Sequence, residues 1–344
     1  MGLISSIIFS IGIIRIFVVF FIAVNILTFI LYVVDKQKSL KNKERISEKT
    51  LIFFTLACGG IGALLGMCIA RHKTKKIKFK IAVVIGLIIA IIPIIHIVHG
   101  LTVDREIAYV EVEFHSENWS YELDGYRIAF MTDFHVTPHE DMRDVVAELN
   151  ERNIDLLLLG GDFSTHGLHY RGTVREIAQT NVTDGIFGVD GNHDYYRWLF
   201  SAFEQYGVIP LDNNGFQIRE GFYLAGVQDM WRRNPNVQEA TQNANAEDFI
   251  LLVTHNPDVA MTQSTSHLDL ILAGHTHGGQ ITLFGFPMYL LRNHITRYGT
   301  RFAHGFAYSA DGVPVFTSRG VGVYYSIPRI FARPEVIIFT MRNV

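Results

Sequence analysis

Two histidines stand two residues apart at the point where an apolar run ends. In "DLILAGHTHGGQ" the apolar residues Leu270–Ala273 lead directly into Gly-His-Thr-His-Gly-Gly, which places His275 and His277 between glycines. Neutral imidazole is the most common metal ligand among protein side chains, so the pair is a candidate metal site. Taken alone, the same residues are equally consistent with a polar loop, and the rest of the chain has to distinguish the two interpretations.

The same pattern follows four other apolar runs. Residues 126–132, 154–160, 185–191, 249–254 and 268–274 each predict a short buried strand. The polar residues that follow these five runs, in chain order, are Asp133 and His135; Asp162; Asn192, His193 and Asp194; His255; and His275 and His277. A single strand-end Asp is usually a helix cap, and a single His is usually a surface residue. The carboxyl ends of strands in an α/β sheet share one edge, however, so we expect these residues to converge.

The residue types at this edge indicate which metals they would bind. Asp, His and Asn without cysteine suit divalent Mn, Fe or Zn. There are too many of them for one tetrahedral centre. They suit two divalent ions about 3.5–4 Å apart that share a carboxylate, an arrangement that activates a bridging water and stabilises phosphoryl displacement. The sequence therefore predicts a binuclear metal centre.

The elements that position these residues read as an α/β domain over residues 101–344. Further strands are predicted at 108–114, where the alternation indicates an exposed strand, and at 222–227, 313–318 and 335–341. A helix is expected at 140–153, with Val145 and Leu149 on its apolar face. Strands separated by helices favour βαβ units.

Residues 1–100 have a different composition and read as a helical membrane domain. Apolar runs at 16–34 and 81–98 are long enough to cross a bilayer, and a third run lies between them at 51–70. Because apolar runs recur, a cleaved signal peptide is a poor interpretation. Cys58 and Cys68 both lie in the middle run and do not indicate a redox compartment.

The charges divide at the same place and bear on membrane topology. Residues 1–100 hold 13 Lys and Arg against 3 Asp and Glu, a net of +10, whereas the remaining 17 basic and 30 acidic residues give −13. Basic clusters at 36–49 and 71–80 flank the middle run, and basic loops favour the cytoplasmic side. A re-entrant hairpin broken at Gly59 and Gly60 would keep both clusters cytoplasmic, and we prefer it to three plain crossings. It predicts a multi-pass protein of the cell membrane with residues 101–344 outside the cytoplasm.

The strand-end motifs together resemble the calcineurin-like metallophosphoesterase superfamily. The order D-x-H, G-D, G-N-H-D, H and G-H-T-H matches, and "GHTHGGQI" with "SRGVG…IPRIFARPE" is similar to its membrane-associated bacterial branch. That branch includes exported phosphodiesterases and a hydrolase of acylated UDP-glucosamine. The resemblance implies a four-layer α-β-β-α sandwich. Residues 20–90 resemble a small bacterial membrane domain of unknown function, which implies bacterial origin but no activity.

The resemblance also implies a role for each residue. One metal would be held by Asp133, His135 and His277, the other by Asn192, His255 and His275, with Asp162 bridging them. His193 would serve the leaving group as general acid or transition-state stabiliser, with Asp194 orienting it. Apart from the resemblance, the segment 283–301 is unusually apolar for a loop, and it would be either a lid packed on its own domain or a lip that enters the bilayer or grips an acyl chain. Arg292, Arg297 and Arg319 are candidate phosphate-binding residues.

These expectations define the function as a membrane-anchored phosphoesterase that uses two divalent metal ions. Metal-bridging water would attack a phosphodiester, phosphomonoester or pyrophosphate bond directly, and a lipid-linked substrate would suit a site held near the bilayer. A hydrolase of the acylated UDP-glucosamine type is an alternative function. The rivals are a metal-bound scaffold without catalysis, against which His193 and Asp194 argue, and a transporter or sensor whose main activity lies in the membrane part. Membrane lipid is an expected partner, nucleic acid is not, and the sequence leaves the oligomeric state open.

Overall fold

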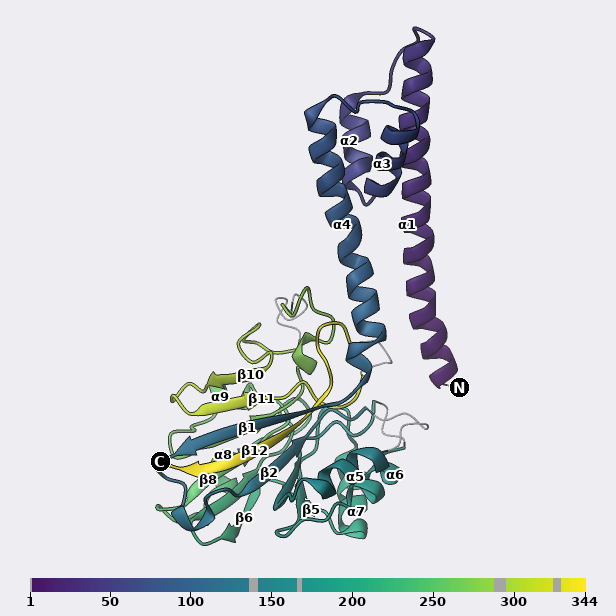
Figure 1. Ribbon diagram of the computed structural model, residues 1–344. Coiled ribbons are helices and arrows are strands. Elements are labelled where there is room, and N and C mark those ends of the chain that lie inside the picture. Colours follow the sequence, from purple (N-terminus) through teal and green to yellow (C-terminus); the bar gives the residue numbers. More distant parts are fainter. Residues whose placement is uncertain (1, 136–141, 166–168, 288–294, 324–328) are drawn as a thin grey trace. The chain divides into compact units, whose positions relative to one another are not determined.

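The computed structural model describes residues 2–135, 142–165, 169–287, 295–323 and 329–344, and their chain path is drawn in Figure 1. The chain divides into two compact units, one of Ile4–Leu101 and one that contains Thr102–Val344. The division falls where charge and hydropathy change in the sequence. The predicted domains, residues 1–100 and 101–344, stay a prediction.

The first unit contains four helices of very different lengths. They are α1 (Gly2–Leu40), α2 (Glu48–Leu56), α3 (Gly60–Ile69) and α4 (Ile77–Leu101). Within α1 and α4, Val18–Leu40 and Ile77–Gly100 are long and apolar enough to cross a membrane. At 1.5 Å per residue, α2 and α3 each span roughly 15 Å, about half of a bilayer core. The middle apolar run is thus a helical hairpin and not one continuous helix.

The break in this hairpin is closed by Asn25 of α1. Its Nδ2 donates to the Cys58 carbonyl at 2.9 Å, and its Oδ1 accepts from the Gly62 amide at 2.8 Å. A Cβ on Gly62 would lie 2.0 Å from the Asn25 carbonyl oxygen, so only glycine permits this approach. The Cys58 carbonyl and the Gly62 amide at the break are therefore satisfied by protein, which the predicted re-entrant hairpin would require at membrane depth.

The second unit is built on two six-stranded sheets. The first has the order β1 (Ala108–Ser116), β12 (Glu335–Asn343), β2 (Arg127–Met131), β3 (Leu156–Leu159), β4 (Ile186–Gly188) and β5 (Ile209–Pro210). The second has the order β10 (Gly305–Tyr308), β11 (Pro314–Thr317), β9 (Leu270–Ala273), β8 (Phe249–Val253), β7 (Phe222–Gly226) and β6 (Asn214–Arg219). β2, β3, β4 and β5 pair in parallel, as do β7, β8, β9 and β11.

Alternating side chains of the strands build the layers. In β2, Ile128 and Phe130 enter the core between the two sheets, whereas Ala129 and Met131 face helices. The helices on the first sheet are α5 (Arg143–Glu151), α6 (Tyr170–Ile177) and α7 (Tyr196–Tyr206), and the second sheet packs on α8 (Val237–Ala240) and α9 (Val259–Thr262). The result is a helix–sheet–sheet–helix sandwich, which confirms the predicted fold class (Figure 1).

The predicted strands are all present, and three others were not predicted. These are β5, β6 and β10, which are short or largely solvent-facing and so carry no clear apolar run. The strand expected to be exposed, β1, is half-buried along one face. The helix expected at 140–153 is described as α5 at Arg143–Glu151, and its expected start lies partly outside the described residues.

Candidate metal centre

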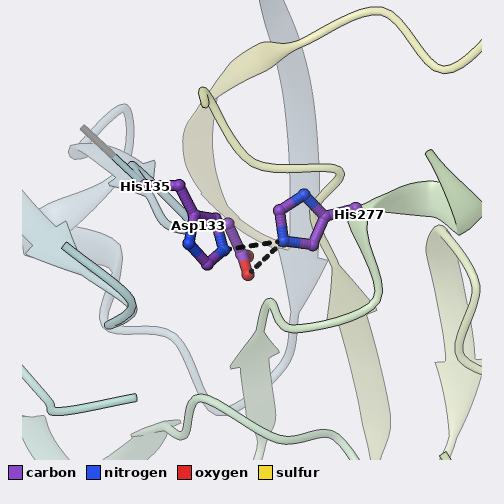
Figure 2. Close-up of side chains that lie close together, drawn as sticks. All are labelled: Asp133, His135 and His277. Atoms are coloured by element: carbon purple, nitrogen blue, oxygen red, sulfur yellow. Dashed lines mark hydrogen bonds and ion pairs between the residues drawn. The ribbon is translucent and has the colours of Figure 1, made fainter. Parts of the chain in front are cut away.

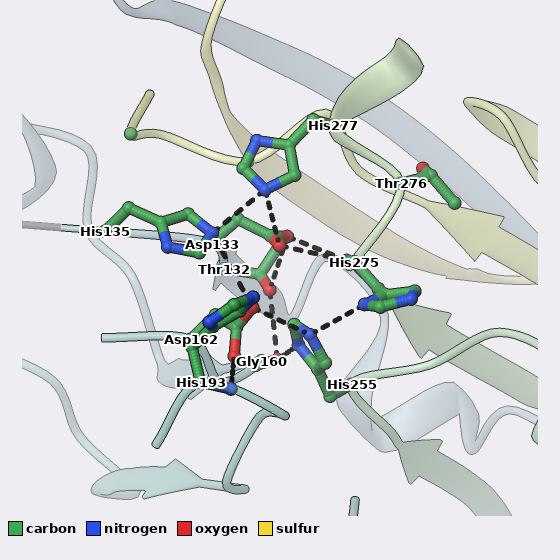
Figure 3. Close-up of polar contacts among 12 residues, drawn as sticks. Thr132, Asp133, His135, Gly160, Asp162, His193, His255, His275, Thr276 and His277 are labelled. Atoms are coloured by element: carbon green, nitrogen blue, oxygen red, sulfur yellow. Dashed lines mark hydrogen bonds and ion pairs between the residues drawn. The ribbon is translucent and has the colours of Figure 1, made fainter. Parts of the chain in front are cut away.

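The loops at the carboxyl ends of five strands converge on one place. Loops after β2, β3 and β4 bring the polar residues of the first sheet, and loops after β8 and β9 bring those of the second (Figure 3). All predicted ligands are buried: Asp133, His135, Asp162, Asn192, His255, His275 and His277. The sequence argument placed them on one sheet edge, whereas the structure draws them from two facing sheets.

Three of these residues form a first group. The Nε2 atom of His277 lies 3.2 Å from Asp133 Oδ1 and 3.0 Å from His135 Nε2, as Figure 2 shows. The Asp133 carboxylate is itself held in place, because its Oδ2 accepts from the Thr132 hydroxyl at 2.9 Å and from the His275 amide at 2.9 Å. Two imidazoles and one carboxylate thus direct their donor atoms at one point.

A second group lies beside the first and is joined to it by Asp162. The Oδ2 atom of Asp162 is 3.2 Å from His255 Nε2 in the second group and 3.5 Å from His135 Nε2 in the first (Figure 3). His275 Nδ1 and Asn192 Oδ1 each lie 3.2 Å from His255 Nε2. One carboxylate oxygen therefore faces ligands of both groups.

Hydrogen bonds to backbone carbonyls set which imidazole nitrogen each group receives. His255 Nδ1 donates to the Gly160 carbonyl at 2.8 Å, and His275 Nε2 donates to the Ile295 carbonyl at 2.8 Å. A carbonyl only accepts, so in the neutral form of each histidine the other ring nitrogen carries the lone pair. These lone pairs point at the shared site, which is how outer hydrogen bonds orient metal-ligating histidines.

The backbone adopts an unusual conformation at the same residues. Asp133, His135, Asp162, His275 and His277 all have positive φ, between 42° and 71°. This left-handed region is uncommon for residues other than glycine, and such strain gathers at functional sites. Each loop turns sharply where its strand ends, so a short segment can aim its side chain inwards.

Burial and the ring of charges shift the pKa values of the site. Burial lowers the pKa of His135 to about 3 and that of His275 to about 4, which leaves both imidazoles neutral. Burial raises the pKa of Asp133 and Asp162, but the neighbouring His277 and His255 outweigh it and hold both carboxyls ionised. Neutral imidazole and ionised carboxylate are the forms that bind metals. His255 differs from His135 and His275, because the effect of burial is outweighed by Asp162, which holds the pKa of His255 well above its usual value, so metal binding there would release a proton.

His193 and Asp194 follow Asn192 on the same loop. The His193 amide donates to Asp162 Oδ1 at 2.8 Å, and its ring centroid lies 5.4 Å from that of His135. Asp194 accepts from the amides of Asp162 and Phe163 at 2.8 and 2.9 Å and from that of Gly191 at 2.9 Å. The described contacts of Asp194 thus hold the Asp162 loop and do not include the His193 ring, so the orienting role expected for Asp194 stays a prediction.

The three predicted arginines have different surroundings. Arg319 pairs with the buried Glu335 at 3.1 Å and lies 3.3 Å from His304 Nδ1, on the wall of a pocket next to His277. The Arg297 side chain is exposed, and its amide donates to Asp258. Arg292 lies outside the described residues.

Two functional candidates were missed at the sequence level. Arg329 is buried and donates to the carbonyls of Gly322, His277 and Ala332, so it fixes the loop that carries His277. Asp229 is fully buried after β7, at the same edge as the ligands. The rule that found the others, a polar residue after a strand, would also have found Asp229, whereas no local pattern distinguishes a buried arginine.

The donor set fits two divalent ions. In each of the groups Asp133, His135, His277 and Asp162, His255, His275, the ligand atoms lie within 4.8 Å of one another. Both groups are buried, combine imidazole nitrogen with carboxylate oxygen, and lack cysteine, which suits Mn, Fe or Zn. The Asp162 oxygen faces a histidine of each group.

The sandwich and the site define a class of metal-dependent phosphate ester hydrolases, and comparisons with known proteins give the family. The family model described as calcineurin-like phosphoesterase matches residues 126–279, and one described as a protein of unknown function (DUF1294) matches residues 25–79. The chain belongs to the calcineurin-like phosphoesterase family.

Three relatives illustrate the range of similarity. The phosphodiesterase YaeI of Escherichia coli is 30% identical over 63% of this chain and 82% of its own length. The uncharacterized metallophosphoesterase YkuE of Bacillus subtilis is 28% identical over 64% of this chain and 80% of its own length. A transmembrane protein with metallophosphoesterase domain from Danio rerio is 25% identical, over 85% of this chain and 71% of its own length.

Proposed function

We propose that this chain is a membrane-anchored, binuclear metal-dependent phosphoesterase. The observation that carries the proposal is the position of Asp162 Oδ2, 3.5 Å from His135 of one ligand group and 3.2 Å from His255 of the other. The relative YaeI of Escherichia coli is named a phosphodiesterase, which supports a phosphodiester as a substrate of this chain. When bound, the two metals supply Lewis-acid charge and activate the attacking water.

Each residue of the site has a proposed role in metal binding or in catalysis. Asp133, His135 and His277 would hold one metal, Asn192, His255 and His275 would hold the other, and Asp162 would contribute to both. His193, which lies beside His135 without belonging to either group, protonates or stabilises the leaving-group oxygen. Asp194 fixes the loop of Asp162 through three backbone amides and so keeps the bridging carboxylate in position.

Hydrolysis of bis-p-nitrophenyl phosphate by the detergent-solubilised full chain tests this function. We expect activity that depends on added Mn²⁺, a content of two metals per chain, and a loss of about 10²- to 10⁴-fold in kcat for His193→Ala with both metals retained. His115→Ala is the matched control, because His115 is exposed on β1. Wild-type turnover in His193→Ala would remove His193 from the mechanism, and absence of any hydrolysis would favour the metal-bound scaffold.

A pocket beside the metal centre supports a lipid-linked substrate. It has a volume of about 310 Å³ and starts at Gly278, next to the ligand His277. Arg319 and His304 form a polar wall, and Phe286, Pro287 and Phe331 form an apolar one. Near it, the side chains of Leu283, Phe284 and Phe286 are 47–55% exposed. A charged wall next to an apolar wall suits the junction between a phosphate and an acyl chain.

Substrate comparison tests this preference. We expect diacylglycerol pyrophosphate or an acylated UDP-glucosamine, each in mixed micelles, to be hydrolysed with a lower KM than bis-p-nitrophenyl phosphate. Phe286→Ser should raise the KM for the lipid roughly tenfold and leave the soluble ester unchanged, while Tyr308→Ser, exposed on β10, changes neither. Equal effects of Phe286→Ser on both substrates would argue against an acyl-binding pocket.

The charges of the membrane unit support an extracytoplasmic site. Asp35 at the end of α1 contacts Arg45, His72 and Lys73, and Glu48 contacts Lys73, Lys76 and Lys78. The two basic clusters therefore lie at the same end of this unit, as the hairpin α2–α3 requires (Figure 1). Basic loops favour the cytoplasm, so α4 would carry the chain outward and release Thr102 on the opposite side.

A further inference from the structure

The turn after β7 is built around a buried carboxylate. Asp229 is fully buried, and its Oδ1 accepts from the amides of Trp231 at 2.9 Å and Arg232 at 2.8 Å. Its Oδ2 has no hydrogen-bond partner among the described residues. The carboxylate thus fixes the amides of Trp231 and Arg232, at the sheet edge that holds the metal ligands.

Trp231 locates this turn against the metal centre. Its ring lies edge-on to that of His275, with ring centroids 4.5 Å apart, and half of the Trp231 side chain remains exposed. The turn consequently borders the second ligand group on its solvent side.

The two arginines that follow Trp231 differ in their partners. Arg233 is committed to the fold, since it pairs with Asp190 at 3.4 Å and Asp212 at 2.7 Å and stacks on Tyr196 at 3.9 Å. Arg232 is exposed, and its side chain has no ion pair or hydrogen bond among the described residues. An exposed guanidinium without a carboxylate partner, fixed at its backbone beside a metal centre, is free to bind an anion.

Arg232 follows directly after the residue that borders the second ligand group. Asp229 fixes the amides of both Trp231 and Arg232, and the Trp231 ring contacts that of His275.

We propose that Arg232 binds the phosphoryl oxygens of the substrate beside the second ligand group, and that Asp229 is the positioning residue that holds Arg232 there. This rests on the proposed function and extends it by naming the residue that recognises the phosphate anion. A guanidinium suits this task because it binds phosphate oxygens in a bidentate manner and keeps its charge at any working pH.

Binding of inorganic phosphate to the Mn²⁺-loaded full chain, followed by titration calorimetry, tests the proposal without requiring turnover. We expect Arg232→Ala to weaken phosphate binding by roughly 10- to 100-fold with metal content unchanged, which is the loss expected for a charge-assisted hydrogen bond. Arg232→Lys should recover part of the affinity. Arg171→Ala, which removes an exposed arginine of α6 that contacts Gln205, should bind phosphate as the wild type does.

The role of Asp229 needs a separate pair of variants. Asp229→Asn keeps an acceptor oxygen for the two amides, so its phosphate affinity should stay within about threefold of the wild type. Asp229→Ala loses this oxygen, and its phosphate affinity should fall to nearly that of Arg232→Ala. Wild-type phosphate affinity in Arg232→Ala, or loss of metal from that variant, would overturn the proposal. If wild-type protein binds phosphate through Arg232 but hydrolyses no ester, the proposed function fails while the binding site stands.

Discussion

A single carboxylate oxygen joins the two ligand groups of this protein. Asp162 Oδ2 faces His135 and His255, while Oδ1 accepts the His193 amide at 2.8 Å. The same side chain is thus connected to both groups and to the loop of the proposed leaving-group residue. A substitution at this position should act on metal binding and on turnover together.

Asp162→Asn tests this coupling. The amide keeps the shape of the side chain but loses the charge that two metals would share, so we expect one metal per chain in place of two. Turnover should fall by more than about 100-fold, the upper end of what changes outside the ligand shell cost. Metal analysis and hydrolysis of bis-p-nitrophenyl phosphate measure both effects, with the exposed Asp144→Asn of α5 as control. Two metals and full turnover in Asp162→Asn would exclude a bridging role.

At the scale of single residues, the sequence predicted the candidate metal ligands but not the side chains that hold the ligand loops in place. The ligand residues follow apolar runs directly, so residue type and position identify them together. Arg329 follows no such rule, because its role depends on which backbone carbonyls surround it after folding. Long-range surroundings of this kind are set by packing, and no short stretch of sequence encodes them.

At the scale of elements, glycine at the end of β9 decides how closely two loops approach. A Cβ on Gly274 would lie 2.2 Å from Thr132 Oγ1 and 2.4 Å from Asp133 Oδ2. Both of these side chains are fully buried, so neither can move aside cheaply. The loop after β9 therefore depends on Gly274 to reach the loop after β2.

Gly274→Ala should accordingly displace Asp133 and weaken metal binding. We expect the metal affinity of the first group to fall about 10- to 100-fold, as for other changes next to metal ligands. Gly172→Ala is a matched control: a Cβ there meets no atom within 4 Å, and α6 should gain up to about 1 kcal/mol of helix stability. Metal titration of both variants measures this difference in affinity. Unaltered metal affinity in Gly274→Ala would mean that the two loops move apart to accommodate the added methyl group.

The elements themselves were predictable where both faces of a strand are buried. β2, β3, β8 and β9 read as apolar runs because one face meets the other sheet and the other face meets helices. β6 and β10 expose much of their surface, and β5 has two residues, so their strand character comes from pairing with neighbours. Only the family resemblance predicted two sheets packed face to face, because the periodicity of the strands is equally compatible with a single sheet.

At the scale of the whole molecule, the basic clusters predict which side of the membrane holds the metal centre. Alkaline phosphatase fused after Val344 should be active in a bacterial host, because α4 would carry the following chain out of the cytoplasm. A fluorescent protein that matures only in the cytoplasm is the matched reporter and should stay dark at the same position. The reverse pair of signals would place the phosphoesterase unit in the cytoplasm and make the hairpin topology wrong.

Each ligand group takes residues from both sheets of the sandwich. Asp133 and His135 come from the first sheet and His277 from the second, while Asp162 comes from the first and His255 and His275 from the second. The two metals would therefore link the strand-end loops of one sheet to those of the other. Chelation should loosen these loops first, so amide hydrogen exchange would become faster in the loops after β2, β3, β8 and β9 while the centres of the strands stay protected. The concentration of available metal would then determine the protein's resistance to proteolysis as well as its activity.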